Sequence, residues 1–366
     1  MSVFATCNNQ NEKKNKNKHA KPATVDGGRR ALLRSLPAAG IVAAFSPWLQ
    51  AQDSTSGIRL LKLHCFELRV ADVARTVAFY QDLFGMPVQS TFGGRTCLKI
   101  GDSNQFMAVR AMLPGETPAI TTLGYSVADY DISTQLAALK QLGFDEIPAP
   151  PVSDAGLVHA MKAWVMDRAG TPELYFADAR GVIAQLSDES YCGGSGPLGA
   201  VCEALQPAEP GLFLLSEINH FTAFVNDGAG ANQFYQESFG LEVQAYQGPN
   251  SPVTGIGDGY QFVMYAGPFP GGENAPASIN HGSLNMHGFD EKDILEKLTA
   301  YGLQDRGERP VAPLMHYVSR RMPARGGAEG GTPEVYFTDP DGILMQLQDL
   351  SYCGGGGYLG SECLRG

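Results

Sequence analysis

The chain has 366 residues, with 27 Lys and Arg against 38 Asp and Glu, and its formal net charge at pH 7 is −11. Eight of those basic residues and two of the acidic ones lie in residues 1–51, so the rest of the chain carries a net charge of −17. A surface this acidic repels phosphate backbones, which excludes nucleic acid as an expected partner. The roughly 315 residues after position 51 suit two domains.

The first predicted element is an export signal in residues 1–51. A lysine-rich segment precedes Arg29-Arg30, and an uncharged stretch over residues 35–50 leads to a small-residue cleavage site at Ala51. This order resembles a twin-arginine (Tat) signal, and a disordered basic tail is the alternative. The apolar stretch is shorter than the roughly 20 residues of a transmembrane helix. We therefore predict a periplasmic or secreted mature protein without a membrane span.

The chain after residue 51 contains the same unit twice. Three motifs recur in the same order, namely Phe-Tyr-Gln at Phe79 and Phe234, Gly-Thr-Pro-Glu at Gly170 and Gly331, and Ser-Tyr-Cys-Gly-Gly at Ser190 and Ser351. Such self-similarity indicates an internal duplication. We predict a first domain over residues 60–203, a linker with two prolines over residues 204–212, and a second domain over residues 213–366.

Each copy is expected to contain two modules of one strand, one helix and three strands. In the first copy the hydrophobic pattern predicts helices over residues 73–84 and 129–142, and strands over residues 61–70, 88–100, 106–112, 121–127, 158–165, 173–176 and 182–186. Asp72 is predicted to cap the first helix and Gly85 to end it. The second copy repeats the pattern, with helices near residues 229–239 and 290–301. The predicted fold class is α+β with four βαβββ modules.

Six cysteines follow residue 51, and they allow 15 pairings. The repeat favours two pairs that each close a short glycine-rich loop, Cys192 with Cys202 and Cys353 with Cys363. In an oxidising compartment these are expected to be disulfides. A thiolate metal site is the alternative, although the spacing is wider than that of usual zinc ligands. Two further cysteines, at positions 65 and 97, have no counterpart in the second copy, so their state stays open.

Two motifs carry a resemblance to a known family. The first helix of each copy ends in Phe-Tyr-x-x-x-Phe-Gly, at residues 79–85 and 234–240, and Tyr-Phe-x-Asp-x-x-Gly occurs at residues 175–181 and 336–342. Together with the succession of modules, they resemble the vicinal oxygen chelate (VOC) superfamily of glyoxalases, bleomycin-resistance proteins and extradiol dioxygenases. The resemblance implies two tandem domains, each a pair of modules that forms a cup-shaped sheet. It also implies a divalent metal chelated by vicinal oxygens of a small-molecule ligand.

The same resemblance implies a metal site in the second cup. His220 lies five residues before Val225, where the family has its first histidine. The second histidine is expected at the position of Ser283, and the nearest candidate is His281, two residues earlier, a spacing that keeps the same face of a strand. The third ligand of the family is a glutamate, which is Gln346 in this chain.

The glutamine at position 346 leaves three alternatives. An amide oxygen can bind a divalent ion, among which the resemblance favours Fe(II), but it brings no charge. Either Gln346 is a neutral ligand, or Glu334 replaces it from the neighbouring strand, or the cup binds no metal. In the first copy Cys65 and Gln185 stand where His220 and Gln346 stand. A metal is therefore expected only in the second copy.

Further side chains are candidates for proton transfer and substrate binding. Tyr336 would donate a proton or a hydrogen bond to a chelated phenolate, or else belong to an aromatic core as Tyr175 would. His159 and His316 occupy the same place in the two copies, so both either stabilise the Gly-Thr-Pro turn or face the cups, where His159 would bind substrate and His316 would act as acid or base. Arg320 or its neighbour Arg321 would bind an anionic substrate group, since only one of them can face the cup from a strand; we select Arg320, and a solvated position is the alternative.

Three functions agree with these features. The first is an exported, metal-dependent enzyme of the extradiol dioxygenase type that acts on a small, oxygen-chelating and possibly aromatic molecule. The second is a non-catalytic periplasmic binding protein of the bleomycin-resistance type. The third is a glyoxalase-like isomerase or lyase, which uses a metal but no oxygen. Neither the substrate nor the oligomeric state follows from the sequence.

Overall fold

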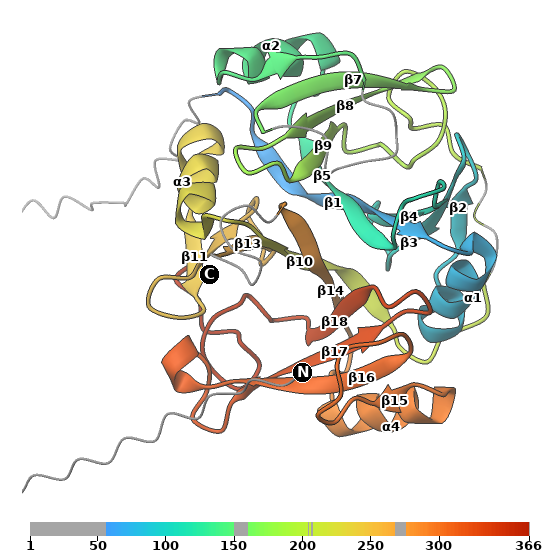
Figure 1. Ribbon diagram of the computed structural model, residues 1–366, viewed down its shortest axis with the longest axis vertical. Coiled ribbons are helices and arrows are strands. Elements are labelled where there is room, and N and C mark those ends of the chain that lie inside the picture. The colour runs from blue at the N-terminus through green and yellow to red at the C-terminus, as the bar shows by residue number, and fades with distance from the viewer. Residues whose placement is uncertain (1–55, 150–159, 204, 206–207, 268–275, 366) are drawn as a thin grey trace, which may run out of the picture. The chain divides into compact units, whose positions relative to one another are not determined.

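The computed structural model describes residues 56–149, 160–203, 205, 208–267 and 276–365 (Figure 1). These residues belong to one compact unit, Gln50–Gly366. The predicted export signal lies outside them. Among the described helices, none is both long and apolar enough to cross a membrane.

The first copy contains two modules in the predicted order. The first module consists of β1 (Leu60–Val70), α1 (Val73–Phe84), β2 (Val88–Ser90), β3 (Arg95–Lys99) and β4 (Phe106–Ala111). The second consists of β5 (Ala119–Val127), α2 (Ile132–Gln141), β6 (Asp145–Glu146), β7 (Lys162–Arg168), β8 (Thr171–Ala177) and β9 (Ile183–Ser187). The observed bounds differ from the prediction in several places: the stretch 88–100 is two strands separated at Gly93-Gly94, α2 begins at residue 132 rather than 129, β6 is an additional short strand, and β7 begins at residue 162 rather than 158.

The second copy repeats both modules. The first consists of β10 (Leu215–Phe224), α3 (Gly228–Phe239), β11 (Val243–Tyr246), β12 (Pro252–Gly255) and β13 (Phe262–Ala266). The second consists of β14 (Ser278–Met286), α4 (Glu291–Tyr301), β15 (Gln304–Asp305), β16 (Met315–Arg321), the 3-10 turn η2 (Pro323–Arg325), β17 (Thr332–Thr338) and β18 (Leu344–Asp349). The predicted α+β class with four βαβββ modules is therefore confirmed.

Capping residues explain where the first helix of each copy begins and ends. The Asp72 carboxylate accepts a hydrogen bond from the peptide N–H of Arg75, and Asp227 does the same for Gly230 at the start of α3. At the other end the backbone is left-handed, with φ of 61° at Gly85 and 66° at Gly240. Glycine adopts this conformation without the steric cost that a Cβ would bring.

The strands pair in the same way in both copies. In the second copy β10 is parallel to β13 and antiparallel to β14, and β14 is parallel to β18. In the first copy β1 pairs with β4 and β5, and β5 pairs with β9. The first strands of the two modules thus lie side by side at the centre of each sheet, which stays open (Figure 1). This arrangement brings residues from both modules onto one surface.

Alternation along the strands gives each sheet two different faces. In β14, Leu284 and Met286 enter the main hydrophobic core, whereas His281, Ser283 and Asn285 lie on the opposite face, as the period of two requires. We call this opposite face of strands β10–β18 the second cup. The corresponding face of β1–β9 is the first cup.

One hydrophobic core serves both copies. The ring of Phe221, next to His220 in β10, lies 5.3 Å from that of Phe66 in β1. The ring of Phe337, next to Tyr336 in β17, lies 5.7 Å from that of Phe84 in α1. The strands that carry the second cup are therefore backed by side chains of the first copy.

Two glutamines join the copies at the first strands. Gln105 accepts a hydrogen bond from the peptide N–H of Ile218 (2.9 Å) and donates one to the carbonyl of Leu63 (2.6 Å). Gln261 does the reverse, accepting from the Leu63 N–H (2.8 Å) and donating to the Ile218 carbonyl (2.6 Å). Each strand has a register shift at this point. At each bulge the peptide N–H is therefore hydrogen-bonded to a glutamine of the other copy, and the carbonyl to a glutamine of the same copy.

Candidate functional site

Four polar or aromatic side chains form one row across the second cup. His220 of β10 is paired with Ser283 of β14, Ser283 with Gln346 of β18, and Gln346 with Tyr336 of β17. Strands β10, β14 and β18 lie next to each other in Figure 1. Ser283 thus occupies the register position that the sequence indicated, directly between His220 and Gln346.

His281 reaches the same row although it is displaced by two residues. It is paired with Thr222, one step along the same face of the sheet. Its ring centre lies 5.5 Å from that of His220 in an edge-on arrangement, and 5.2 Å from that of Tyr336. The structure therefore brings together His220, His281, Gln346 and Tyr336 on one face of the sheet.

An asparagine before each histidine contacts its Nδ1 atom, and for His220 this contact fixes which ring nitrogen carries the proton. Asn219 donates from its amide to the carbonyl of Tyr352 (2.8 Å), so its amide oxygen is the atom that faces the Nδ1 of His220 at 2.6 Å. His220 must then hold its proton on Nδ1, and its Nε2 has a free lone pair. The amide oxygen of Asn280 lies 2.8 Å from the Nδ1 of His281 in the same way. A partner on the second nitrogen is typical of histidines that bind metals.

Burial keeps both imidazoles neutral. Desolvation lowers the pKa of His281 to about 4 and the pKa of His220 well below its ordinary value, and the charge of His281 lowers the latter further. The neighbouring Gln346 amide acts weakly in the opposite direction on both rings. Neutral imidazole is the form that binds a metal ion.

The Gln346 amide is buried without a partner at hydrogen-bond geometry. Within the described ranges, neither its amide oxygen nor its amide nitrogen has a hydrogen-bond partner, and the hydroxyl of the adjacent Ser283 has none either. Such groups are costly in a folded protein unless a further atom completes them. Two free imidazole nitrogens and one amide oxygen on one face fit a divalent ion in number and type of donor. They do not supply the negative charge that a glutamate would bring.

The remaining polar groups of the second cup form an ion-pair network. Glu334 accepts hydrogen bonds from Arg321 Nε (2.9 Å), the Tyr352 hydroxyl (3.2 Å) and, at 3.5 Å, the Tyr336 hydroxyl. Arg321 is fully buried and also donates to the carbonyls of Gly326 and Gly355. Glu334 is therefore committed to Arg321, which disfavours it as the replacement ligand that the sequence left open.

Two candidates lie outside the second cup, and a third is not described. His316 points to the helix side, where its Nε2 lies 2.8 Å from the hydroxyl of Thr299 in α4, so its expected role as acid or base is corrected. Arg320 is half-exposed and pairs with Glu291 at 2.6 Å, so it binds no group inside the cup. Arg321, the next residue of β16, enters the cup instead, because side chains alternate along a strand. His159 lies outside the described residues.

The first cup is filled by its own side chains. Cys65, Gly124, Gln185 and Tyr175 form the row that matches the row of the second cup. Around them Glu173 pairs with two arginines, Arg95 at 2.6 Å and Arg168 at 3.0 Å. A cavity of about 10 Å³ is left, which is room for about one water molecule. Among the described residues, this cup has no counterpart of His220 or His281 in its row and no space for a metal-bound ligand.

The position of His64 explains why it does not replace the missing ligand. It precedes Cys65 as Asn219 precedes His220, and its Nε2 donates to the carbonyl of Tyr191 (2.6 Å), as Asn219 donates to that of Tyr352. His64 is thus the counterpart of the asparagine rather than of the metal ligand. Burial lowers its pKa to about 4.

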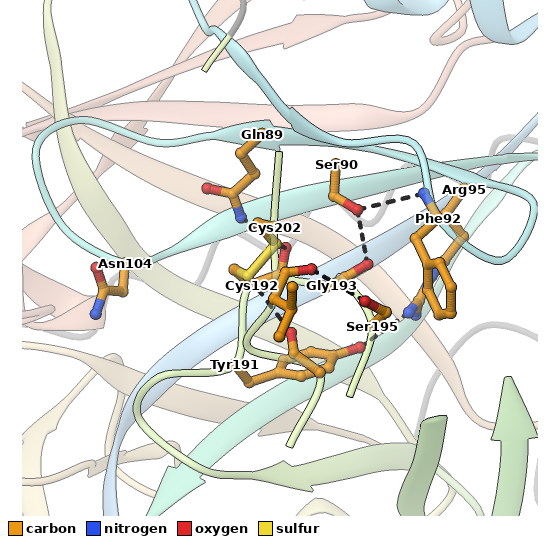
Figure 2. The surroundings of a disulfide bond; sticks show 12 residues. Gln89, Ser90, Phe92, Arg95, Asn104, Tyr191, Cys192, Gly193, Ser195 and Cys202 are labelled. Carbon is orange, nitrogen blue, oxygen red and sulfur yellow. Dashed lines mark hydrogen bonds between the residues drawn. A yellow bond between two sulfur atoms is a disulfide. The ribbon is translucent and has the colours of Figure 1, made fainter. Parts of the chain in front are cut away.

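The two predicted disulfides are present, Cys192–Cys202 and Cys353–Cys363, while Cys65 and Cys97 are free and buried. Figure 2 shows the first disulfide and its surroundings, in which Gln89 and Ser90 donate to the carbonyls of Cys192 and Gly193. Each loop follows a tyrosine whose hydroxyl bonds the buried glutamate of its cup. The loops therefore hold the walls of both cups.

Removal of the second disulfide should destabilise the protein measurably. Replacing both Cys353 and Cys363 by serine is expected to lower the free energy of unfolding by about 2–4 kcal/mol, because the unfolded chain loses its cross-link. Urea unfolding without reductant would measure this loss. Adding reductant should bring the wild-type protein to the stability of a variant that lacks both disulfides. Free thiols at these two positions in non-reducing mass spectrometry would contradict the pairing.

Several residues of the site escaped the sequence analysis. Asn219 and Asn280 were missed, although the dipeptide Asn-His precedes both candidate ligands and is a signal that could have found them. Phe262 stacks on the ring of His220 with centres 4.3 Å apart, and Tyr352 lies 5.7 Å from the same ring. Neither aromatic residue has a spacing that distinguishes it from ordinary core residues.

Comparison with known proteins agrees with this geometry. Residues 217–347 match the family model of the Glyoxalase/Bleomycin resistance protein/Dioxygenase superfamily, and residues 62–101 match that of the Bleomycin resistance protein-like N-terminal region. No curated protein matches the sequence.

Solved structures with a similar fold include dioxygenases. Homoprotocatechuate 2,3-dioxygenase from Brevibacterium fuscum, in complex with 3,4-dihydroxyphenylacetate, is 17% identical over 80% of this chain and 82% of its own, with a TM-score of 0.51. A catechol 2,3-dioxygenase is 14% identical over 82% of this chain and 89% of its own, also with a TM-score of 0.51. The chain therefore has the fold of the glyoxalase, bleomycin resistance protein and dioxygenase (VOC) superfamily, and its second copy matches that superfamily in sequence.

Proposed function

We propose that the second cup binds a divalent metal ion, Fe(II) being favoured, and through it a small molecule with two vicinal oxygens. The observation that carries this proposal is the pair of histidines whose Nε2 lone pairs are free because Asn219 and Asn280 engage both Nδ1 atoms. The buried, unpartnered amide of Gln346 beside them supplies a third donor. The reaction class that this arrangement supports best is that of extradiol dioxygenases.

The chain's own residues have distinct roles in this proposal. A bound ion would polarise the ligand oxygens and, if it is redox-active, allow reaction with O2. Burial raises the pKa of Tyr336 well above its ordinary value, so its hydroxyl stays protonated and can donate to an anionic oxygen. Without a ligand that hydroxyl donates its single proton to Glu334 at 3.5 Å, and it would turn from Glu334 to donate to the ligand. Phe262 covers one face of His220 and excludes water from it.

The proposed location is the periplasm or the exterior of the cell, reached by the Tat route. Two disulfides support an oxidising compartment. The order of basic, apolar and small residues in residues 1–51 supports the signal.

A second candidate is a binding protein without turnover. It is favoured by Gln346, because an amide in place of a carboxylate weakens the hold on a divalent ion and changes its reactivity. Glyoxalase-like isomerase or lyase chemistry would use the same donors without O2. Oxygen uptake separates the dioxygenase from both alternatives.

Loss of one imidazole should abolish metal binding. In anaerobic dialysis of the mature protein against Fe(II) and catechol, we expect about one ion per chain. His220→Ala should weaken binding at least tenfold, as loss of a ligand does in metalloproteins. The control is His287→Ala, because His287 is exposed and outside the cup. Thermal unfolding would verify that both variants fold.

Two results would contradict the proposal. Equal Fe(II) binding by His220→Ala and the wild-type protein would remove the second cup as the metal site. Catechol binding that is unchanged by removal of Fe(II) would instead favour the metal-free binding protein. Admission of O2 to the loaded protein then tests turnover, since a dioxygenase consumes one O2 per molecule of catechol.

A further inference from the structure

The donors of the second cup are all neutral. His220 and His281 bind a metal as neutral imidazoles, and the asparagines at their Nδ1 atoms leave Nε2 as the ligand atom. Gln346, which is 1% exposed, carries no charge. A divalent ion that enters this cup therefore meets three ligands and no counter-charge among them.

The surroundings of the donors do not supply that charge either. The charged pair nearest to the row of donors is Arg321 with Glu334, and Glu334 neutralises Arg321 through a buried ion pair at 2.9 Å. A further carboxylate, Glu217, is paired with Asn285 rather than with Ser283. Among the described residues, the row of His220, Ser283, Gln346 and Tyr336 thus contains no carboxylate.

A bare divalent ion is therefore poorly stabilised at this place. Moving a charge from water into a buried site is costly unless an opposite charge accompanies it. From this charge balance we infer that the second cup takes up a divalent ion together with a doubly anionic chelating ligand, as an electrically neutral unit. This inference rests on the proposed function and specifies its ligand class.

Unpartnered donors on the same face support an anionic ligand. The hydroxyl of Ser283 and the amide nitrogens of Gln346 and Gln348 are buried without a hydrogen-bond partner within the described residues. Ser283 and Gln346 are paired in register beside His220, and Gln348 is paired with Asn285, one step further along the same face. Donors that can reach a ligand oxygen strengthen when that oxygen is charged. The cup is therefore suited to a ligand such as a catecholate or a dicarboxylate.

The test measures how strongly ion and ligand depend on each other. Mn(II) binding to the mature protein would be titrated by calorimetry alone, with oxalate, and with oxamate, correcting for complexes in free solution. Oxalate and oxamate are similar in size, but oxalate carries two charges and oxamate one. We expect oxalate to raise the apparent Mn(II) affinity roughly 30- to 100-fold, within the range of ordinary coupling between sites. Oxamate should raise it several-fold less.

The matched variant restores the missing charge. Gln346→Glu should bind Mn(II) alone about tenfold more tightly or better, and the effect of oxalate should shrink by a similar factor. Gln185→Glu makes the same substitution at the same register position of the first cup, where the described row holds Cys65 and Gly124 in place of His220 and Ser283. It should leave Mn(II) binding unchanged. Thermal unfolding of both variants would verify the fold.

The outcomes separate this inference from the proposed function. Tight Mn(II) binding by the wild-type protein alone, changed less than threefold by oxalate, would overturn the neutral-unit inference and leave the metal site intact. An equal effect of oxalate and oxamate would overturn it as well. Absence of Mn(II) binding both with and without oxalate would overturn the inference and the metal site together.

Discussion

Replacing Arg321 by methionine is expected to lower the free energy of unfolding by about 3–5 kcal/mol, because it leaves the buried Glu334 carboxylate without its counter-charge. Arg321 is fully buried and donates to Glu334 and to two main-chain carbonyls. The substitution removes the guanidinium, but the free-energy cost of burying the Glu334 carboxylate remains. Urea unfolding at pH 7 would measure it.

The first copy offers a matched control for this prediction. Arg168→Met removes the corresponding arginine, but Glu173 still pairs with Arg95 at 2.6 Å. Its cost should be nearer the roughly 1.5–3 kcal/mol of a hydrogen bond to a charged group. Adding Glu334→Gln to Arg321→Met should recover part of the loss. If Arg321→Met and Arg168→Met lower the free energy of unfolding equally, the Arg321 ion pair contributes no more to stability than that of Arg168.

The stability of the protein should depend on pH through His64. Burial lowers its folded pKa from 6.5 to about 4. Below pH 6.5 the unfolded chain takes up a proton that the folded chain does not, so the stability that is present at pH 7 is lost as the pH falls toward 4. The expected loss from this one group is about 3 kcal/mol, at 1.36 kcal/mol for each unit of pKa.

His64→Asn would isolate that contribution. It installs the residue found at the matching place of the second copy, Asn219, which can also donate to the tyrosine carbonyl. The difference in unfolding free energy between the wild-type protein and this variant should fall by about 3 kcal/mol between pH 7 and pH 4. The same comparison with His287→Asn, at an exposed position, should be flat. A flat difference for His64→Asn as well would show that its ring is protonated normally.

The fold followed from the sequence because its signals are local and occur twice. Asp72 and Gly85 mark the ends of α1 by capping chemistry, and the recurrence of the same motif after residue 234 marks α3. The disulfides followed from the same repetition. The alignment of His220 with Ser283 could be predicted because side chains alternate between the two faces of a strand. Counting residues along the first strand of each module therefore shows which of them share a face.

The roles of individual side chains could not be predicted as well. Whether His316 faces the cup or the helix depends on which residue begins β16, and a one-residue shift reverses the face. The same shift decides between Arg320 and Arg321. Asn219 acts only because a carbonyl more than a hundred residues away in sequence orients its amide. Contacts of this kind leave no periodic pattern in a single sequence.

The aromatic contacts between the copies suggest what the first copy contributes. Phe66 and Phe84 of the first copy pack behind the strands that carry His220 and Tyr336. Preorganisation of a site requires that its supporting strands be held rigidly. The first copy would thus act as a rigid backing for the metal site proposed in the second cup.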